Sequence, residues 1–427
     1  MLQINYIRQN PLLVKEKLAA RNFSNIALVD EILEMDEMIR KKKASTENIQ
    51  ASINSASKEI GMLMAKGNKE IAEEKKLEVA AFKNALSEQS TALTSQEESF
   101  TNKILLLPNL PHDSVPPGKS AEDNITVREG GTIPTLPQNA KPHWELIKDY
   151  DLIDFETGAK LAGSGFPLYK GKGAKLQRAL IQYFLDYNTE AGYTEYLPPL
   201  MVNETTAYGT GQLPDKEGQM YHITEDKLYL IPTGEVPVTN VYSNEIVKES
   251  SLPIKMTAYT PCFRREAGSF GADVRGLNRV HQFDKVEIIQ LVHPKKSYET
   301  LEEMVIHVER LLQFLELPYR ILRLCGGDMG FTSALTFDFE VYSAAQQKWL
   351  EVSSVSNFET FQTNRMKIRF RSEKDDSGKP QLLHSLNGSS LALPRIVAAL
   401  LENNQADDGI HLPKVLHNYF GAAVIGS

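Results

Sequence analysis

The chain has 427 residues, with 47 Lys+Arg against 55 Asp+Glu, a net charge of −8 and 41% hydrophobic residues. This composition is typical of a globular protein of two or three domains, at roughly 150 residues per domain. It lacks both the ~20-residue apolar run that crosses a bilayer and an apolar signal-peptide core near the N-terminus. Its two cysteines, Cys262 and Cys325, exclude a disulfide framework and a four-thiolate zinc site. We therefore expect a cytoplasmic protein without a membrane anchor.

Residues 28–107 predict two long helices that pack as a coiled coil. Mostly apolar positions, with a few polar ones between them, recur in alternating steps of four and three, from Leu28 through Ile39 to Leu63, and again from Ala72 to Leu107. A turn is expected at 65–69, around Gly67-Asn68. Each helix, at about 35 residues, would be about 50 Å long. The segment predicts an antiparallel helical hairpin.

The hairpin alone allows two interpretations. It could be a spacer or a dimerisation device, or it could bind a partner. Its 11 Lys+Arg and 14 Asp+Glu do not make it a basic rod. The acidic balance of the whole chain gives no indication of nucleic acid, and we expect no DNA binding.

Residues 108–142 predict a linker or an irregular extended segment. They contain seven of the chain's 21 prolines. Proline at this density prevents regular helix and interrupts strands, so the segment predicts a domain boundary.

The remainder of the chain predicts an α+β body, an antiparallel sheet flanked by helices. Amphipathic or apolar patterns indicate helices at 174–190 and 391–402. Period-two patterns and turn residues indicate strands at 193–197, 257–266, 280–291, 336–342 and 349–358.

Two of these strands carry an ionic face. If both are regular, Arg264 and Glu266 share a face of the first, and His281, Phe283, Lys285 and Glu287 share a face of the second, opposite Val280, Val286 and Ile288. Such a face can be the solvated side of a half-exposed sheet. Arginine also offers a fork to phosphate oxygens, phenylalanine a surface for a base, and glutamate an acceptor for an amine. The set therefore also fits a nucleotide and an amine-bearing substrate.

Residues 261–287 resemble motif 2 of the seryl-tRNA synthetases of bacterial type, a class II aminoacyl-tRNA synthetase family. The resemblance extends over the whole chain. Residues 158–165 and 193–199 resemble the motif 1 region. Residues 230–236, 351–357 and 383–389, with Arg395 as the motif 3 arginine, resemble the remaining active-site blocks. It implies a tRNA-binding domain at 1–107 with the coiled hairpin, the linker at 108–142, and a class II catalytic domain at 143–427.

The resemblance also implies site residues. Arg264 matches the arginine on the α-phosphate and the serine carboxylate, and Arg395 the arginine at the triphosphate; these two are the expected catalytic residues. Glu266 matches the glutamate near the adenine amino group, and Phe283 the ring that stacks on adenine. The full ATP-binding set is Arg264, Arg265, Glu266, Val280, Phe283, Glu351, Val352, Ser353, Ser354 and Arg395. Magnesium would be held with ATP by Glu351 and Ser354, whose oxygens suit that cation; no zinc is expected.

The implied serine pocket contains Thr233, Gly234, Glu235, Arg264, Glu287 and Ser385. Two of these depart from the family pattern. The family often has Thr-Ala-Glu or Thr-Ser-Glu where this chain has Thr233-Gly234-Glu235, and often threonine where Ser385 stands. The arm lysines expected at tRNA are Lys66, Lys69, Lys75 and Lys76.

The implied activity is that of a serine–tRNA ligase. ATP would activate L-serine to seryl-adenylate, and the seryl group would pass to the 3′ end of serine tRNA, with selenocysteine tRNA as a possible second acceptor. The family forms homodimers, and we expect one here. Two alternatives come from other classes: a synthetase-like protein that loads a carrier protein, and a non-catalytic protein that keeps the fold.

Overall fold

The computed structural model describes residues 1–216, 218–266, 275–372 and 378–426. It divides into two compact units, Met1–Ala19 with Phe23–Pro108, and Ala20–Asn22 with Asn109–Ser427. Residues 267–274 of the segment that resembles motif 2 lie outside the described residues. No helix in the described part of the chain is both long enough and apolar enough to span a bilayer.

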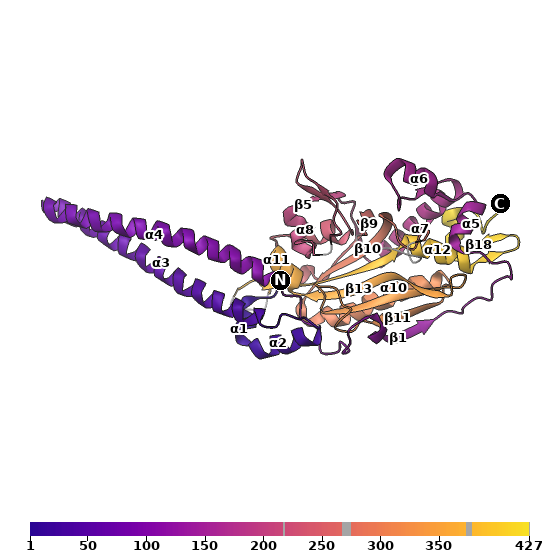
Figure 1. The fold of residues 1–427 in the computed structure, drawn as a ribbon, viewed down its shortest axis with the longest axis horizontal. Helices are drawn as coiled ribbons and strands as arrows, with labels where there is room; N and C mark the ends of the chain where they lie inside the picture. Colours follow the sequence, from indigo (N-terminus) through magenta and orange to yellow (C-terminus); the bar gives the residue numbers. More distant parts are fainter. Residues whose placement is uncertain (217, 267–274, 373–377, 427) are drawn as a thin grey trace. The chain divides into compact units, whose positions relative to one another are not determined.

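The first unit contains the predicted hairpin. Two short helices, α1 (Ile4–Gln9) and α2 (Pro11–Ala20), precede α3 (Leu28–Ala65) and α4 (Lys69–Ile104). Figure 1 shows α3 and α4 running side by side as two long helices. Their seam contains Ile53, Ala56 and Val79, which are buried, with Phe82 and Leu86 packed against them. The predicted helical hairpin is confirmed.

The second unit is built on an eight-stranded sheet. The strand order is β1-β11-β12-β13-β16-β10-β9-β4, antiparallel except for the parallel pair of β4 with β9. The strands are β1 (Ile125–Gly130), β4 (Thr194–Glu195), β9 (Ile254–Phe263), β10 (Gln282–Val292), β11 (Tyr319–Arg323), β12 (Leu335–Ser343), β13 (Lys348–Glu359) and β16 (His384–Ala392). The predicted α+β body with an antiparallel sheet is confirmed.

Three long helices pack on this sheet. α10 (Ser297–Phe314) contacts β13 and β16, α12 (Leu393–Asn403) contacts β10, β12 and β13, and α7 (Gly171–Glu190) contacts β9 and β10. Their apolar sides form the main core with alternate residues of the strands.

The strand β10 is buried on both faces. Val286 and Ile288 enter the main core, while Ile289 and Leu291 enter a second apolar cluster on the other face. Lys285 and Glu287 share that other face and are also buried. The ionic face is therefore enclosed, which argues against its being the solvated side of a half-exposed sheet.

Two features differ from the sequence expectations. Residues 125–130 lie within the proline-rich segment but form β1, which pairs with β11 at one edge of the sheet. The first ionic strand was expected to run to residue 266, but β9 ends at Phe263. The backbone N–H of Arg264 still donates to the carbonyl of His281 at 2.9 Å. Glu266 then has φ of +48°, so Arg264 and Glu266 do not share a strand face.

Smaller elements surround the sheet. The remaining α-helices of the described residues are α5 (His143–Asp149), α6 (Phe155–Ala162), α8 (Glu204–Thr210), α9 (Glu235–Thr239), α11 (Phe361–Met366) and α13 (His417–Phe420). The remaining strands form small sheets: β2 (Ile153–Asp154) with β3 (Leu168–Tyr169); β5 (Met201–Asn203), β6 (His222–Ile223) and β7 (Leu228–Leu230); β8 (Ile246–Lys248), β14 (Arg369–Arg371) and β15 (Gln381–Leu382); and β17 (Gln405–Ala406), β18 (Gly409–His411) and β19 (Val424–Ile425).

Candidate active site

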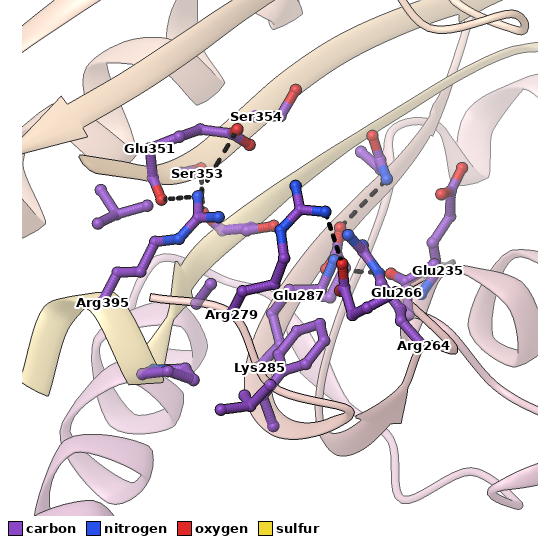
Figure 2. Close-up of a pocket in the computed structure, with 18 of the residues that line it drawn as sticks. Glu235, Arg264, Glu266, Arg279, Lys285, Glu287, Glu351, Ser353, Ser354 and Arg395 are labelled. Atoms are coloured by element: carbon purple, nitrogen blue, oxygen red, sulfur yellow. Dashed lines mark hydrogen bonds and ion pairs between the residues drawn. The ribbon is translucent and has the colours of Figure 1, made fainter. Parts of the chain in front are cut away.

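A cavity of about 350 Å³ opens on the ionic face of β10. Figure 2 shows Arg395, Glu351, Ser353 and Ser354 on one side of it, and Glu235, Arg264 and Glu266 on the other. The lining comes from β10, β13, β16, the first turns of α9 and α12, and residues outside these elements, among them the segment 277–280. It comprises Gln212, Thr233, Glu235, Arg264, Glu266, Leu277, Asn278, Arg279, Val280, Phe283, Lys285, Glu287, Glu351, Val352, Ser353, Ser354, Ser356, Phe358, Asn387, Ser389, Ala392, Pro394 and Arg395.

One side of the cavity is built around the buried carboxylate of Glu287. Lys285 Nζ lies 2.6 Å from its Oε2, and the two side chains are only 8% and 1% exposed. Asn387 Nδ2 donates to Oε1 at 3.1 Å, and the Thr233 hydroxyl lies 3.4 Å from Oε2. Burial raises the pKa of Glu287, against the opposing effects of Lys285 and Arg264. The carboxylate is thus fixed in place by donors before any ligand arrives.

A second buried carboxylate, Glu235, lies on the same side. It begins α9, and its Oε1 accepts a hydrogen bond from Gln362 Nε2 at 2.6 Å. Burial raises the pKa of Glu235 to about 7, and the charge of Glu287 adds to that rise. This side of the cavity therefore offers two carboxylates to a small cationic group.

Arg264 stands next to these carboxylates. Its Nε donates to the carbonyl of Pro232 at 3.3 Å, and its guanidinium lies 5.3 Å from the centroid of the Phe283 ring. Half-buried and held at two points, the guanidinium presents its remaining N–H groups to the cavity. Such a fork suits a phosphate or a carboxylate.

The opposite side of the cavity carries the second arginine. Arg395 Nη1 donates to the backbone carbonyl of Glu351 at 2.7 Å and lies 3.7 Å from that residue's Oε2. Arg395 Nε donates to the carbonyl of Asn278 at 3.0 Å. Because the side chains are 28% and 52% exposed, this side is more open to solvent than the carboxylate side.

The segment 275–280, which enters the cavity, is held from behind by a buried pair. Glu402 Oε1 accepts from the backbone N–H of His143 at 2.8 Å and lies 2.6 Å from its Nδ1. His143 Nε2 accepts from the backbone N–H of Leu277 at 2.9 Å. With Nε2 an acceptor, Nδ1 is the ring nitrogen that faces Glu402. The pair fixes the backbone that carries Asn278.

Comparison with known proteins assigns the chain to a family. The family model for the seryl-tRNA synthetase N-terminal domain matches residues 1–111, and that for the class II tRNA synthetase core domain (G, H, P, S and T) matches residues 220–404. The serine–tRNA ligase of Salinibacter ruber is 50% identical over 428 residues, covering 100% of both chains. That of Methylacidiphilum infernorum is 49% identical, covering 98% of this chain and 99% of the relative. The chain belongs to the seryl-tRNA synthetase family.

A solved structure supports the same assignment. The seryl-tRNA synthetase of Pyrococcus horikoshii, complexed with ATP, superposes with a TM-score of 0.92 at 34% identity, covering 100% of this chain and 99% of that one. The sheet and helices of the second unit are therefore a class II synthetase core, and the enzyme is an aminoacyl-tRNA synthetase of this family.

Most residues predicted from the family resemblance meet in the one cavity. It is lined by Thr233, Glu235, Arg264, Glu266, Val280, Phe283, Glu287, Glu351, Val352, Ser353, Ser354 and Arg395. Three do not line it. Arg265 is exposed, while Gly234 and Ser385 are buried, and Ser385 donates to Gln362 Oε1 at 2.8 Å. The structure thus places Ser385 behind the cavity rather than in its lining, and its contact with serine stays a prediction.

Ser389 is the β16 hydroxyl that lines the cavity instead. Alternation along β16 puts Ser385, Asn387 and Ser389 on one face, so spacing could have suggested all three but could not choose among them. Sequence analysis placed Lys285 on the ionic face without assigning it to the site. It missed Arg279, whose Nη1 lies 3.0 Å from Glu266 Oε2.

The residues expected to hold magnesium fit that cation. Glu351 and Ser354 both line the cavity and supply the oxygen ligands that magnesium prefers. Asp338 pairs with Ser354 across β12 and β13, and its Oδ1 is buried without a partner among the described residues. Burial and the charge of Glu351 raise the Asp338 pKa well above its usual value. No group of three or more His, Cys, Asp or Glu side chains able to hold a metal occurs in the part of the chain that the structure describes.

The four arm lysines differ from one another. Lys75 pairs with Glu59 and Glu78, and Lys76 with Glu73, all within the hairpin. Lys66 and Lys69 flank the turn and are exposed, with no side-chain partner among the described residues. The two turn lysines are therefore the more available for a phosphate backbone.

Proposed function

We propose that this synthetase activates L-serine with ATP and transfers the seryl group to the 3′ end of serine tRNA. The observation that carries the proposal is the single cavity in which Arg264 stands beside two buried carboxylates, with Arg395, Glu351 and Ser354 opposite. A binding site for an amino acid offers acceptors to its ammonium group and a cation to its carboxylate. A nucleotide requires arginines, a flat ring and a magnesium site.

The carboxylate side fits the amino acid. Glu235 and Glu287 would accept from the serine ammonium and hydroxyl groups, with Thr233 and Ser389 as further hydrogen-bonding partners in the lining. Arg264 would hold the serine carboxylate. Alanine would leave buried polar groups unpaired, and such a site can discriminate by ~10⁴-fold, whereas a methyl difference alone gives ~10–200-fold.

ATP fits across the cavity, with its adenine beside Arg264 and its triphosphate toward Arg395. Phe283 offers a face for adenine and Glu266 an acceptor for its amino group, while Arg395 would meet the triphosphate. Glu351 and Ser354 would hold magnesium. When bound, magnesium supplies positive charge at the phosphate oxygens.

The chemistry requires positioning rather than a protein nucleophile. An oxygen of the serine carboxylate attacks the α-phosphorus, the bond to the bridging oxygen breaks, and pyrophosphate leaves. The terminal ribose hydroxyl of the tRNA then attacks the activated carbonyl, and AMP leaves. Arg264 aligns the carboxylate with the α-phosphate and stabilises charge there, which accounts for catalysis by proximity and electrostatics.

The hairpin of the first unit would bind the tRNA. RNA recognition through shape and backbone suits an arm with isolated lysines better than reading of base edges does. We further propose a cytoplasmic homodimer formed through the motif 1 region, with selenocysteine tRNA as a second possible acceptor.

Pyrophosphate exchange without tRNA tests the activation step. The full chain, ATP and magnesium would be incubated with each of the twenty amino acids in turn. We expect exchange with serine alone. No exchange with any amino acid would favour the non-catalytic alternative, and exchange with glycine or alanine would favour loading of a carrier protein.

A further inference from the structure

Gln362 lies behind the cavity and contacts Glu235. It belongs to α11, is 1% exposed and does not line the cavity. Its Nε2 donates to Glu235 Oε1 at 2.6 Å and to the carbonyl of Thr210 at 3.2 Å. Its Oε1 accepts from the Ser385 hydroxyl at 2.8 Å. All three contacts are buried.

These contacts permit only one orientation of the amide. If it were reversed, Oε1 would face both the Glu235 carboxylate and the Thr210 carbonyl, three acceptors without a donor. Nε2 would then face the Ser385 hydroxyl. The Glu235 carboxylate and the Thr210 carbonyl therefore set which end of Gln362 faces them, and Ser385, which does not line the cavity, donates to the Oε1 end. A threonine hydroxyl at position 385 could do the same.

Glu235 depends on this donor because its other neighbours do not bond to it. Glu287 and Lys285 on β10 and Arg264 after β9 face it, but Lys285 is in contact with Glu287 and Arg264 bonds to Pro232. Among the described residues, Gln362 supplies the one side-chain hydrogen bond to the Glu235 carboxylate. A buried carboxylate without a donor takes up a proton or turns away.

We propose that Gln362 is a positioning residue for substrate recognition. It holds Glu235 as a carboxylate directed at the substrate ammonium, and Ser385 anchors the Oε1 end of the Gln362 amide. The inference rests on the proposed function, since it assigns the ammonium to Glu235. A glutamine that merely fills the core would affect stability and leave recognition unchanged.

The test compares variants of the full chain in pyrophosphate exchange, with KM measured separately for serine and ATP. Q362L leaves Glu235 buried without its donor, so we expect KM for serine to rise about 10- to 100-fold while KM for ATP changes less than about twofold. S385A should raise KM for serine about three- to tenfold, and S385T should restore it. Q290L is the matched control, because Gln290 is 2% exposed, bonds to Tyr193 and does not line the cavity.

Thermal unfolding of the same variants separates recognition from stability. Q362L and Q290L are both expected to lose stability, but only Q362L should change KM for serine. Equal serine KM values in Q362L and Q290L, an equal rise for ATP, or failure of S385T to restore binding would each overturn the proposal.

A measurement without substrate separates this proposal from the proposed function. Infrared titration of ¹³C-glutamate-labelled protein should show a buried carboxyl band that is absent in E235Q. In Q362L that band should titrate at a higher pH. An unmodified chain without serine-dependent exchange would overturn the proposed function, whereas an unshifted band in Q362L would overturn the role of Gln362.

Discussion

The arm and the cavity place opposite charges together in different ways. On the arm, Lys43 and Glu97 form a pair 2.6 Å apart with side chains 51% and 43% exposed. In the cavity, Lys285 and Glu287 form a pair at the same distance with 8% and 1% exposed. An exposed pair contributes about 0–1 kcal/mol, because water screens it. Breaking a buried pair costs far more, because the remaining charge is stranded. Two ion pairs with the same distance between their charged atoms can therefore differ greatly in how much their loss destabilises the protein.

The largest effect is expected at Arg264. Arg264→Ala removes the cation next to both the serine carboxylate and the α-phosphate, so we expect serine-dependent exchange to fall by about 100- to 1000-fold. Steady-state exchange kinetics would measure this. Arg178→Ala, on the exposed side of α7, is the control and should retain activity. Loss of less than tenfold at Arg264 would remove it from the proposed machinery.

The second prediction concerns the buried pair. Lys285→Met leaves Glu287 without its cation, so we expect the free energy of unfolding to fall by roughly 3–5 kcal/mol. Denaturant unfolding would measure it. The double variant K285M/E287Q should be more stable than K285M alone, because no charge remains stranded. For comparison, Lys43→Met on the arm should change stability by less than about 1 kcal/mol.

The third prediction uses the pKa of Glu235. With that pKa at about 7, the carboxyl is largely protonated at pH 6 and ionised at pH 8. The ionised form binds the substrate ammonium much more strongly than the neutral one, so KM for serine should fall as pH rises, up to about tenfold per pH unit below the pKa. KM for ATP provides the internal reference. A serine KM that is flat between pH 6 and 8 would contradict this assignment.

The smallest effect is expected on the arm. Lys66→Ala with Lys69→Ala should raise KM for tRNA several-fold, about 1 kcal/mol in total, while exchange without tRNA is unchanged. Lys75→Ala with Lys76→Ala should have less effect, because these lysines already pair within the hairpin. Equal loss of aminoacylation and exchange would contradict the separation of tRNA binding from activation.

Much of this architecture could be predicted from the sequence. Heptad spacing predicted the hairpin, and period-two alternation predicted β10, β12 and β13, because those patterns follow burial directly. The strand β1 could not be predicted, since its partner β11 is almost 200 residues away and its own residues are mostly exposed. After the end of β9 at Phe263, Glu266 has a positive φ, which its residue type does not indicate.

In the serine pocket, sequence spacing alone cannot tell which residue of a strand face lines the cavity. Ser385 and Ser389 share a strand face, but Gln362 of α11 covers the first, and the second opens on the cavity. Only the packing of a helix distant in sequence distinguishes them. The pairing of β10 with β16 also shifts between Lys285 and Glu287, so the neighbours of those side chains cannot be counted from the sequence.

Because β10 is buried on both faces, its local opening should be rare. A strand packed into two apolar clusters opens only when both clusters open, so its amide hydrogens should be among the slowest to exchange with solvent. Lys285 and Glu287 belong to that strand, and their contacts are therefore maintained through ordinary local fluctuations. We therefore expect the floor of the cavity to open more rarely than its solvent-exposed rim, where Glu351 is 52% exposed.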